Sequence, residues 1–216
     1  MRNRFDRELS ALNKKMIELG AVCETLIARA SRALLDGDSA LAGEVVKDSE
    51  TIGEWEREIE ALAVRLLLQE QPVAGDLRQI SAALKMVTDI GRIGDQAEDI
   101  AEIVPFLKGV ELSDCGIIHE MAKATVRMVS GSIDAFVRKD AALAEEVIRQ
   151  DDHVDSLFLR MKESLITMIS EHPEKGEAAL DLLMISKYFE RIGDHAVNIA
   201  GWVIYSVTGK RKGAEE

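Results

Sequence analysis

The chain has 216 residues and a formal charge of −12, which results from 39 acidic and 27 basic side chains. A hydrophobic fraction of 47% is enough to build a buried core and excludes a largely disordered chain. The acidic balance argues against nucleic acid and anionic membrane surfaces as partners, because their phosphate groups repel negative charge.

Cysteine usage and apolar runs indicate the compartment. Cys23 and Cys115 are isolated, without the CxxC or Cys/His spacing of a disulfide scaffold or a zinc site. The first ten residues lack the apolar region of a secretion signal, and no run approaches the ~18 apolar residues of a membrane-spanning helix. We therefore expect a cytoplasmic protein with no direct membrane insertion.

Three long helices are predicted in the first half. Apolar residues recur at steps of three and four over residues 5–33 and again over residues 45–66, as in the seams of helical bundles. Asp38 is placed to act as the N-cap of the second helix. A third helix is expected to begin near Pro72 and to end at about Val104.

The second half repeats this order. A fourth helix covers residues 121–135, a fifth follows the predicted N-cap Asp140, and a sixth follows Pro173. No segment shows the alternating pattern of a β-strand. The helices are much longer than the ~11–12 residues usual in globular proteins, which requires extensive side-by-side packing.

An internal repeat defines the architecture. LKMVTDIGRIGDQAEDIAEIV (residues 84–104) recurs as LMISKYFERIGDHAVNIAGWV (183–203), and DSALAGEVV (38–46) recurs as DAALAEEVI (140–148). Two halves built on one plan predict an all-α protein of two tandem, pseudo-symmetric three-helix bundles with six long antiparallel helices. The predicted boundaries are residues 1–108 and 112–210, followed by a flexible tail at 211–216.

Acidic pairs in the second half suggest a metal site. Residues four apart share a helix face, so Asp151 with Asp155, and Glu190 with Asp194, place like charges side by side. If these two helices are neighbours, the pairs could converge on a cation, and carboxylate oxygens suit iron, manganese, magnesium or zinc. The alternative is that they form solvated faces, paired with nearby lysine and arginine side chains.

At this point the sequence resembles a known family. ERIGDHAVNIA (190–200), VTDIGRIGDQAEDIAEI (87–103), PVAGDLRQI (72–80) and DDHVD (151–155) are similar to motifs of the PhoU family of phosphate-transport regulators, in the same order and over essentially the whole chain. The resemblance implies two similar three-helix bundles in a cytoplasmic, often dimeric adaptor protein. It also implies multinuclear iron or zinc clusters bound by E/DxxxD motifs.

The resemblance further implies a regulatory role. Family members work with the ATPase subunit of the phosphate ABC importer and with a phosphate-sensing histidine kinase. They keep the phosphate-starvation response off when phosphate is plentiful. We therefore expect a negative regulator of phosphate uptake and homeostasis.

The family's metal motifs match the two halves unequally. The second half has all four carboxylates, whereas Ser49, Gly53 and Gly91 occupy three of the corresponding positions in the first half and only Asp95 remains. Asp99 and Asp89 are possible substitutes, as are Asp48 and Glu50. We predict that the second half binds metal more strongly. The candidate ligands are Asp151, Asp155, Glu190, Asp194, Asp95, Asp99 and Asp89.

Among the possible functions, an interaction protein fits best and an enzyme is not expected. The chain lacks a nucleophile–base grouping and a glycine-rich phosphate loop, and only 4% of its residues are aromatic. A metal-dependent hydrolase or redox enzyme of helical-bundle type is the alternative, but neither RIGD helix has the ExxH pair of di-iron bundles. A direct phosphate sensor could use only Arg78, Arg92 and Arg191, which salt bridges explain equally well.

Overall fold

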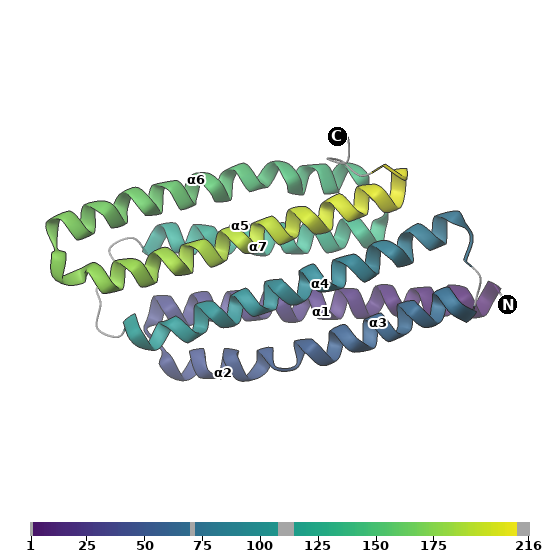
Figure 1. The fold of residues 1–216 in the computed structure, drawn as a ribbon, viewed down its shortest axis with the longest axis horizontal. Coiled ribbons are helices and arrows are strands. Elements are labelled where there is room, and N and C mark those ends of the chain that lie inside the picture. The colour runs from purple at the N-terminus through teal and green to yellow at the C-terminus, as the bar shows by residue number, and fades with distance from the viewer. Residues whose placement is uncertain (1, 70–71, 108–114, 211–216) are drawn as a thin grey trace.

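The computed structural model describes residues 2–69, 72–107 and 115–210. It consists of long helices, each of which buries an apolar stripe. The first lobe contains α1 (Arg2–Asp36), α2 (Ser39–Ser49), α3 (Ile52–Gln69), α4 (Ala74–Ile103) and a 3₁₀ turn (Val104–Leu107). The second lobe contains α5 (Cys115–Arg138), α6 (Ala141–Glu171), a 3₁₀ turn (Pro173–Lys175) and α7 (Gly176–Thr208). Figure 1 shows the two lobes as stacked layers of antiparallel helices, which confirms the predicted all-α pair of bundles.

Equivalent turns open the second helix of each lobe. Asp38 caps α2 by accepting hydrogen bonds from the backbone N–H groups of Ala40 and Leu41, both at 3.0 Å. Asp140 caps α6 by accepting from Leu143 N at 3.0 Å, so both predicted N-caps are confirmed. The residues before them, Gly37 and Lys139, have φ values of +63° and +55°, so each turn passes through the left-handed region.

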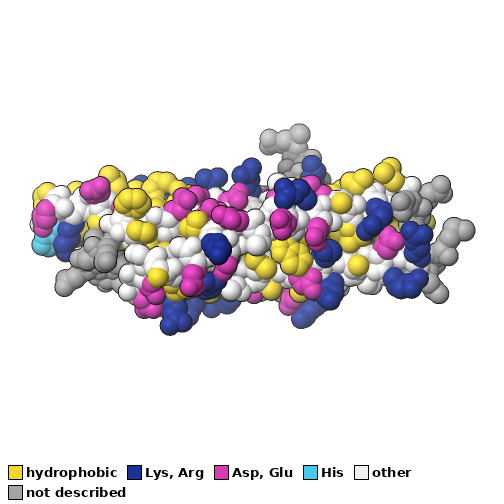
Figure 2. All heavy atoms as spheres, turned by 90° about the horizontal axis from the view of Figure 1, so that it is seen from below, with side chains coloured by type: hydrophobic (Ala, Val, Ile, Leu, Met, Phe, Trp, Pro, Cys, Tyr) yellow, Lys and Arg dark blue, Asp and Glu magenta, His cyan; other side chains and the backbone are white. Residues whose placement is uncertain are grey.

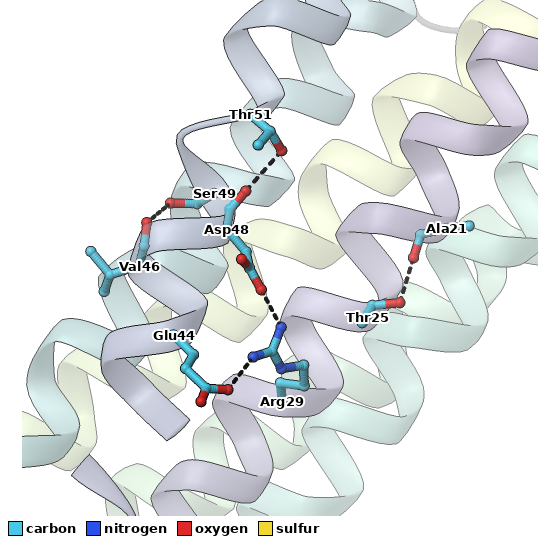
Figure 3. Close-up of polar contacts among 8 residues, drawn as sticks. All are labelled: Ala21, Thr25, Arg29, Glu44, Val46, Asp48, Ser49 and Thr51. Carbon is cyan, nitrogen blue, oxygen red and sulfur yellow. Dashed lines mark hydrogen bonds and ion pairs between the residues drawn. The ribbon is translucent and has the colours of Figure 1, made fainter. Parts of the chain in front are cut away.

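The second predicted helix is interrupted, and this differs from the sequence prediction. Ser49 Oγ donates to Val46 O at 2.6 Å and Thr51 Oγ1 donates to Asp48 O at 2.8 Å, as Figure 3 shows. Hydroxyl groups that bond nearby carbonyls compete with the helical ladder, and here they separate α2 from α3. In the second lobe the equivalent helix, α6, is unbroken.

The two RIGD helices join the lobes. α4 packs along α7, and α1 packs along α5, so a single apolar core extends through both layers. Ile93, Ala97 and Ile100 of α4 and Ile192 and Ile199 of α7 are fully buried. The packing of α4 on α7 and of α1 on α5 holds the two lobes together as one body.

Two sequence predictions fall partly outside the described residues. The predicted boundary between the halves, at residues 108–112, and the predicted tail, at 211–216, lie outside the described residues. None of the helices in the described ranges has an apolar stretch long enough to cross a membrane. Figure 2 shows the face formed by α2 and α3, where acidic side chains are spread along the middle and basic ones gather near the N-terminal end.

Candidate metal-binding site

The acidic pairs of the second lobe do come from neighbouring helices. Asp151 and Asp155 lie on α6, Glu190 and Asp194 lie on α7, and these two helices pack along their length. Asp151 and Glu190 are partly buried, whereas Asp155 and Asp194 are exposed at the rim. The structure therefore brings the four predicted carboxylates into one cluster, which we call the second-lobe carboxylate cluster.

The Asp151 carboxyl group of this cluster has a strongly raised pKa. Burial, followed by the charges of Asp155, Asp194 and Glu190, raises it from 3.8 to about 6. Burial followed by the Glu190 charge also raises the pKa of Asp194, against the opposing charge of Lys187. Because a raised carboxyl pKa means that the negative charge is poorly solvated, a cation at this place would be stabilised.

Two carboxylate oxygens in the cluster lack hydrogen bonds. Asp151 Oδ1 and Glu190 Oε2 are both buried without a hydrogen-bond donor among the described residues. Glu190 Oε2 is nevertheless paired with the Lys187 ammonium, so Asp151 Oδ1 is the oxygen of the cluster that has neither a hydrogen bond nor an ion pair among the described residues. A buried anionic oxygen without a donor costs free energy, and a metal ion is one group that removes this cost.

Gly193 makes room for Asp151. A Cβ at position 193 would lie 3.0 Å from Asp151 Oδ1, closer than ordinary van der Waals contact. The glycine of the RIGD sequence therefore lets an acidic side chain of α6 approach the backbone of α7. The structure thereby identifies Asp151 as the group that this glycine admits.

The donor set fits a hard or borderline cation, because it consists of carboxylate oxygens from facing helices. In the side-chain positions of the described ranges, however, no group of three or more His, Cys, Asp or Glu residues is arranged to hold a metal ion. Binding would thus require the exposed Asp155 and Asp194 side chains to rotate inward. Such rotation is inexpensive for carboxylates at the surface.

The first lobe neutralises its acids with arginine. Asp95, the counterpart of Asp194, forms an ion pair with Arg92 at 3.2 Å. Asp48, named in the sequence analysis as a possible substitute, is held by Arg29 of α1, which also bonds Glu44 at 2.8 Å. Figure 3 shows the Arg29 guanidinium between these two carboxylates. These acids therefore have counter-charges within the protein.

The other two candidates of the first lobe face the second lobe. Asp99 is partly buried, and burial together with the charges of Glu102 and Asp95 raises its pKa. Asp89 lies 2.9 Å from His195 Nδ1 and accepts from Asn198 Nδ2 at 3.3 Å, both on α7. Asp89 is thus part of the contact between lobes, so the structure does not bring it together with Asp95.

Glu56 is an acidic residue of the first lobe that the sequence analysis missed. A Cβ at Gly91 would lie 1.7 Å from Glu56 Oε1, so the space next to Gly91 is filled by the Glu56 side chain. Burial and the nearby Asp95 charge raise the pKa of Glu56. Gly91 corresponds to Glu190, and the carboxylate absent from α4 is thus supplied by α3. The signal in the sequence is Gly91, which stands where the second half of the repeat has Glu190 and which indicates that a facing helix could supply the carboxylate.

Comparison with known proteins identifies the class. A family model described as the PhoU domain matches residues 16–104 and again residues 118–203. The chain is therefore an all-helical protein made of two PhoU domains, one in each lobe.

Relatives and solved structures agree over nearly the whole length. A protein of Clostridium acetobutylicum named phosphate-specific transport system accessory protein PhoU homolog is 36% identical over 211 residues, or 96% of this chain and 95% of that relative. The crystal structure of PhoU from Pseudomonas aeruginosa has a TM-score of 0.90 and 35% identity, and it covers 95% of this chain and all of that one. That of the phosphate transport system regulatory protein PhoU from Streptococcus pneumoniae has a TM-score of 0.90 and 26% identity.

The chain belongs to the PhoU family. This is a family of regulatory accessory proteins and not of enzymes, which agrees with the expectation from the sequence. The alternative of a metal-dependent hydrolase or redox enzyme receives no support from the relatives.

Proposed function

We propose that the protein is a cytoplasmic accessory regulator of phosphate uptake and phosphate homeostasis. In this role it is an adaptor between the ATPase subunit of a phosphate ABC importer and a phosphate-sensing histidine kinase, and it holds the phosphate-starvation response off when phosphate is plentiful. It acts by docking, as a homodimer, and biases the signalling states of its partners without chemistry of its own.

One observation carries this proposal: two PhoU domains fill the chain, and relatives that match over more than nine-tenths of its length are named as accessory proteins of a phosphate-specific transport system. The architecture is compatible with a docking role. It consists of long helices, and Figure 2 shows charged side chains over the face formed by α2 and α3.

We also propose that the second-lobe carboxylate cluster binds a multinuclear iron or zinc centre. Asp151, Asp155, Glu190 and Asp194 would supply the oxygen ligands, and the two buried oxygens without hydrogen bonds support this assignment. The metal would neutralise the cluster and fix α6 against α7. Removal of bound metal with a chelator, followed by metal counting, tests this part of the proposal without reference to regulation.

The adaptor role is tested by co-purification. Tagged protein is expressed from its own locus in cells grown at high and at low phosphate, and the importer ATPase and the kinase are quantified in the eluate. We expect both partners at high phosphate and a change in their recovery at low phosphate. If neither partner is recovered in either condition, the adaptor role is wrong.

Negative regulation is tested separately. Deletion of the gene should switch on a reporter of the phosphate-starvation response at high phosphate, and the intact gene should restore repression. A reporter that stays off in the deletion strain would contradict negative regulation, whatever the outcome of the co-purification.

A further inference from the structure

A groove between α1 and α5 is lined by apolar and basic side chains, although the protein as a whole is acidic. It has a volume of about 660 Å³ and is lined by residues 28–36 of α1 and 119–127 of α5. The apolar part of its lining includes Leu35 and Val126, both half-buried, and Ala122. The groove lies away from the second-lobe carboxylate cluster, whose residues belong to α6 and α7, and from Glu56 and Asp95 on α3 and α4.

The charge of this groove is opposite to that of the whole protein. Lys123, Arg127 and Arg32 line it, with only one acidic residue, Asp36, which is already paired with Arg32 at 3.3 Å. Lys123 and Arg127 are exposed, and neither forms an ion pair with any residue that the structure describes. In a chain of charge −12, two free cations beside an apolar strip favour an anionic, amphipathic ligand.

The dimensions of the groove suit a helix. α1 and α5 pack against each other and run antiparallel (Figure 1), so the groove that both helices line follows their axes. The lining residues span nine positions on each helix, or roughly 12 Å at 1.5 Å per residue. This length matches the roughly 10 Å between anchors i and i+7 of a helix laid into a groove.

We propose that the α1–α5 groove docks an acidic amphipathic helix of a partner protein. Leucine-type anchors would cover Leu35 and Val126, while glutamate or aspartate side chains beside those anchors would pair with Lys123 and Arg127. This inference concerns a surface outside the proposed metal site, and it does not depend on the proposed role in phosphate regulation.

The test uses ¹⁵N-labelled protein and a synthetic helical peptide of about 18 residues, with leucine at i, i+4 and i+7 and glutamate on both sides of this stripe. A second peptide has the same stripe with lysine in place of glutamate. We expect the acidic peptide to shift amide signals of residues 28–36 and 119–127, and the basic peptide to bind at least about tenfold more weakly.

Two variants identify the contacts. Lys123→Glu with Arg127→Glu should weaken binding of the acidic peptide by about tenfold or more, and Val126→Ser should weaken it by about threefold while leaving the charge intact. The matched control, Lys85→Glu with Lys162→Glu, has the same change in net charge on exposed residues outside the groove and should change affinity by less than about twofold. All variants are checked for an unchanged helical circular dichroism signal.

Several outcomes would overturn the proposal. They are equal binding of the two peptides, shifts that lie outside the groove, equal losses in the groove and control variants, and no shift at all. Sedimentation of the free protein completes the test, because loss of a dimer in the Lys123→Glu, Arg127→Glu variant would mean that a second copy of the chain, and not a partner helix, occupies this surface.

Discussion

The two lobes use one scaffold but neutralise acidic residues in different ways. In the second lobe the partly buried Asp151 has an oxygen with no hydrogen bond and a pKa raised to about 6, while Glu190 is paired with Lys187. In the first lobe Asp95 is paired with Arg92, and Arg29 holds Glu44 and Asp48.

This difference shows that duplication preserves helices more strictly than charge. Apolar positions keep their periodicity in both lobes because the core requires it, whereas surface acids can be exchanged for any arrangement that balances their charge. An excess of unbalanced negative charge is then the mark of a site for an external cation, and Asp151 Oδ1 of the second lobe is a buried carboxylate oxygen with neither a hydrogen bond nor an ion pair among the described residues. The following predictions test this contrast.

The largest effect is expected on metal binding. Glu190→Ala should reduce affinity for iron or zinc by about 100-fold, because it removes a ligand from the cluster, whereas Asp95→Ala should change it by less than about threefold. Metal content after equilibrium dialysis, measured by mass spectrometry, gives both values. Equal losses in the two variants would reject the asymmetry between lobes.

Placing a glutamate at position 91, where the second lobe has Glu190, should lower the stability of the protein. Gly91→Glu would force a second carboxylate into the space that Glu56 fills, and we expect the free energy of unfolding to fall by about 1–3 kcal/mol. Urea denaturation measures this loss. The double variant Gly91→Glu, Glu56→Ala should recover most of it, and independent, additive effects of the two substitutions would contradict the proposed contact.

The raised pKa of Asp151 predicts a pH dependence of stability in metal-free protein. The folded state binds the Asp151 proton more tightly than the unfolded state, so the free energy of unfolding should fall as pH rises from 3.8 to about 6. Asp151→Asn should remove the contribution of this group to the dependence and, after allowance for solvent screening of a partly exposed side chain, stabilise the protein at pH 7 by about 1–2 kcal/mol. Urea denaturation in chelator at acidic and neutral pH provides the measurement.

The exposed neighbour Asp152 supplies the control for that experiment. Asp152→Asn removes one negative charge from the same helix, as Asp151→Asn does. Of the causes that raise the pKa of Asp151, however, the Asp152 charge is the weakest. The stability of the Asp152→Asn variant should therefore still fall between pH 4 and 6. A similar gain in both variants would mean that overall charge, rather than burial of Asp151, controls the effect.

The smallest effect concerns the arginine links between helices. Arg29→Ala should lower the free energy of unfolding by about 1 kcal/mol, because its side chain is 28% exposed and bonds two carboxylates of α2. Arg160→Ala in the second lobe should cost less than about 0.5 kcal/mol, because its side chain is 57% exposed and lies 3.7 Å from Glu120. Equal costs would show that the link in the first lobe is no stronger.

Much of the fold could be predicted because helical periodicity and the internal repeat are local signals. The apolar series, the N-caps Asp38 and Asp140 and the three-helix plan all follow from them. The break between α2 and α3 could not, because the apolar spacing continues through Val45 and Ile52 while side-chain hydroxyls end the helix.

The candidate site was predictable where one helix face contains both acids, as with Asp151 and Asp155. It was not predictable where the partner comes from a different helix, as with Glu56 beside Gly91 and Asp89 beside His195. Those contacts depend on how helices and lobes are placed in space, and a single sequence contains no direct record of that placement.

The continuous core formed by α4 and α7 has a consequence for each half of the duplicated chain. α4 and α7 pack against each other across the two halves, so a fragment encoding one half alone would expose to water the part of α4 or α7 that now lies between the lobes. A single half would therefore need a second half, on the same chain or on another, to cover that surface.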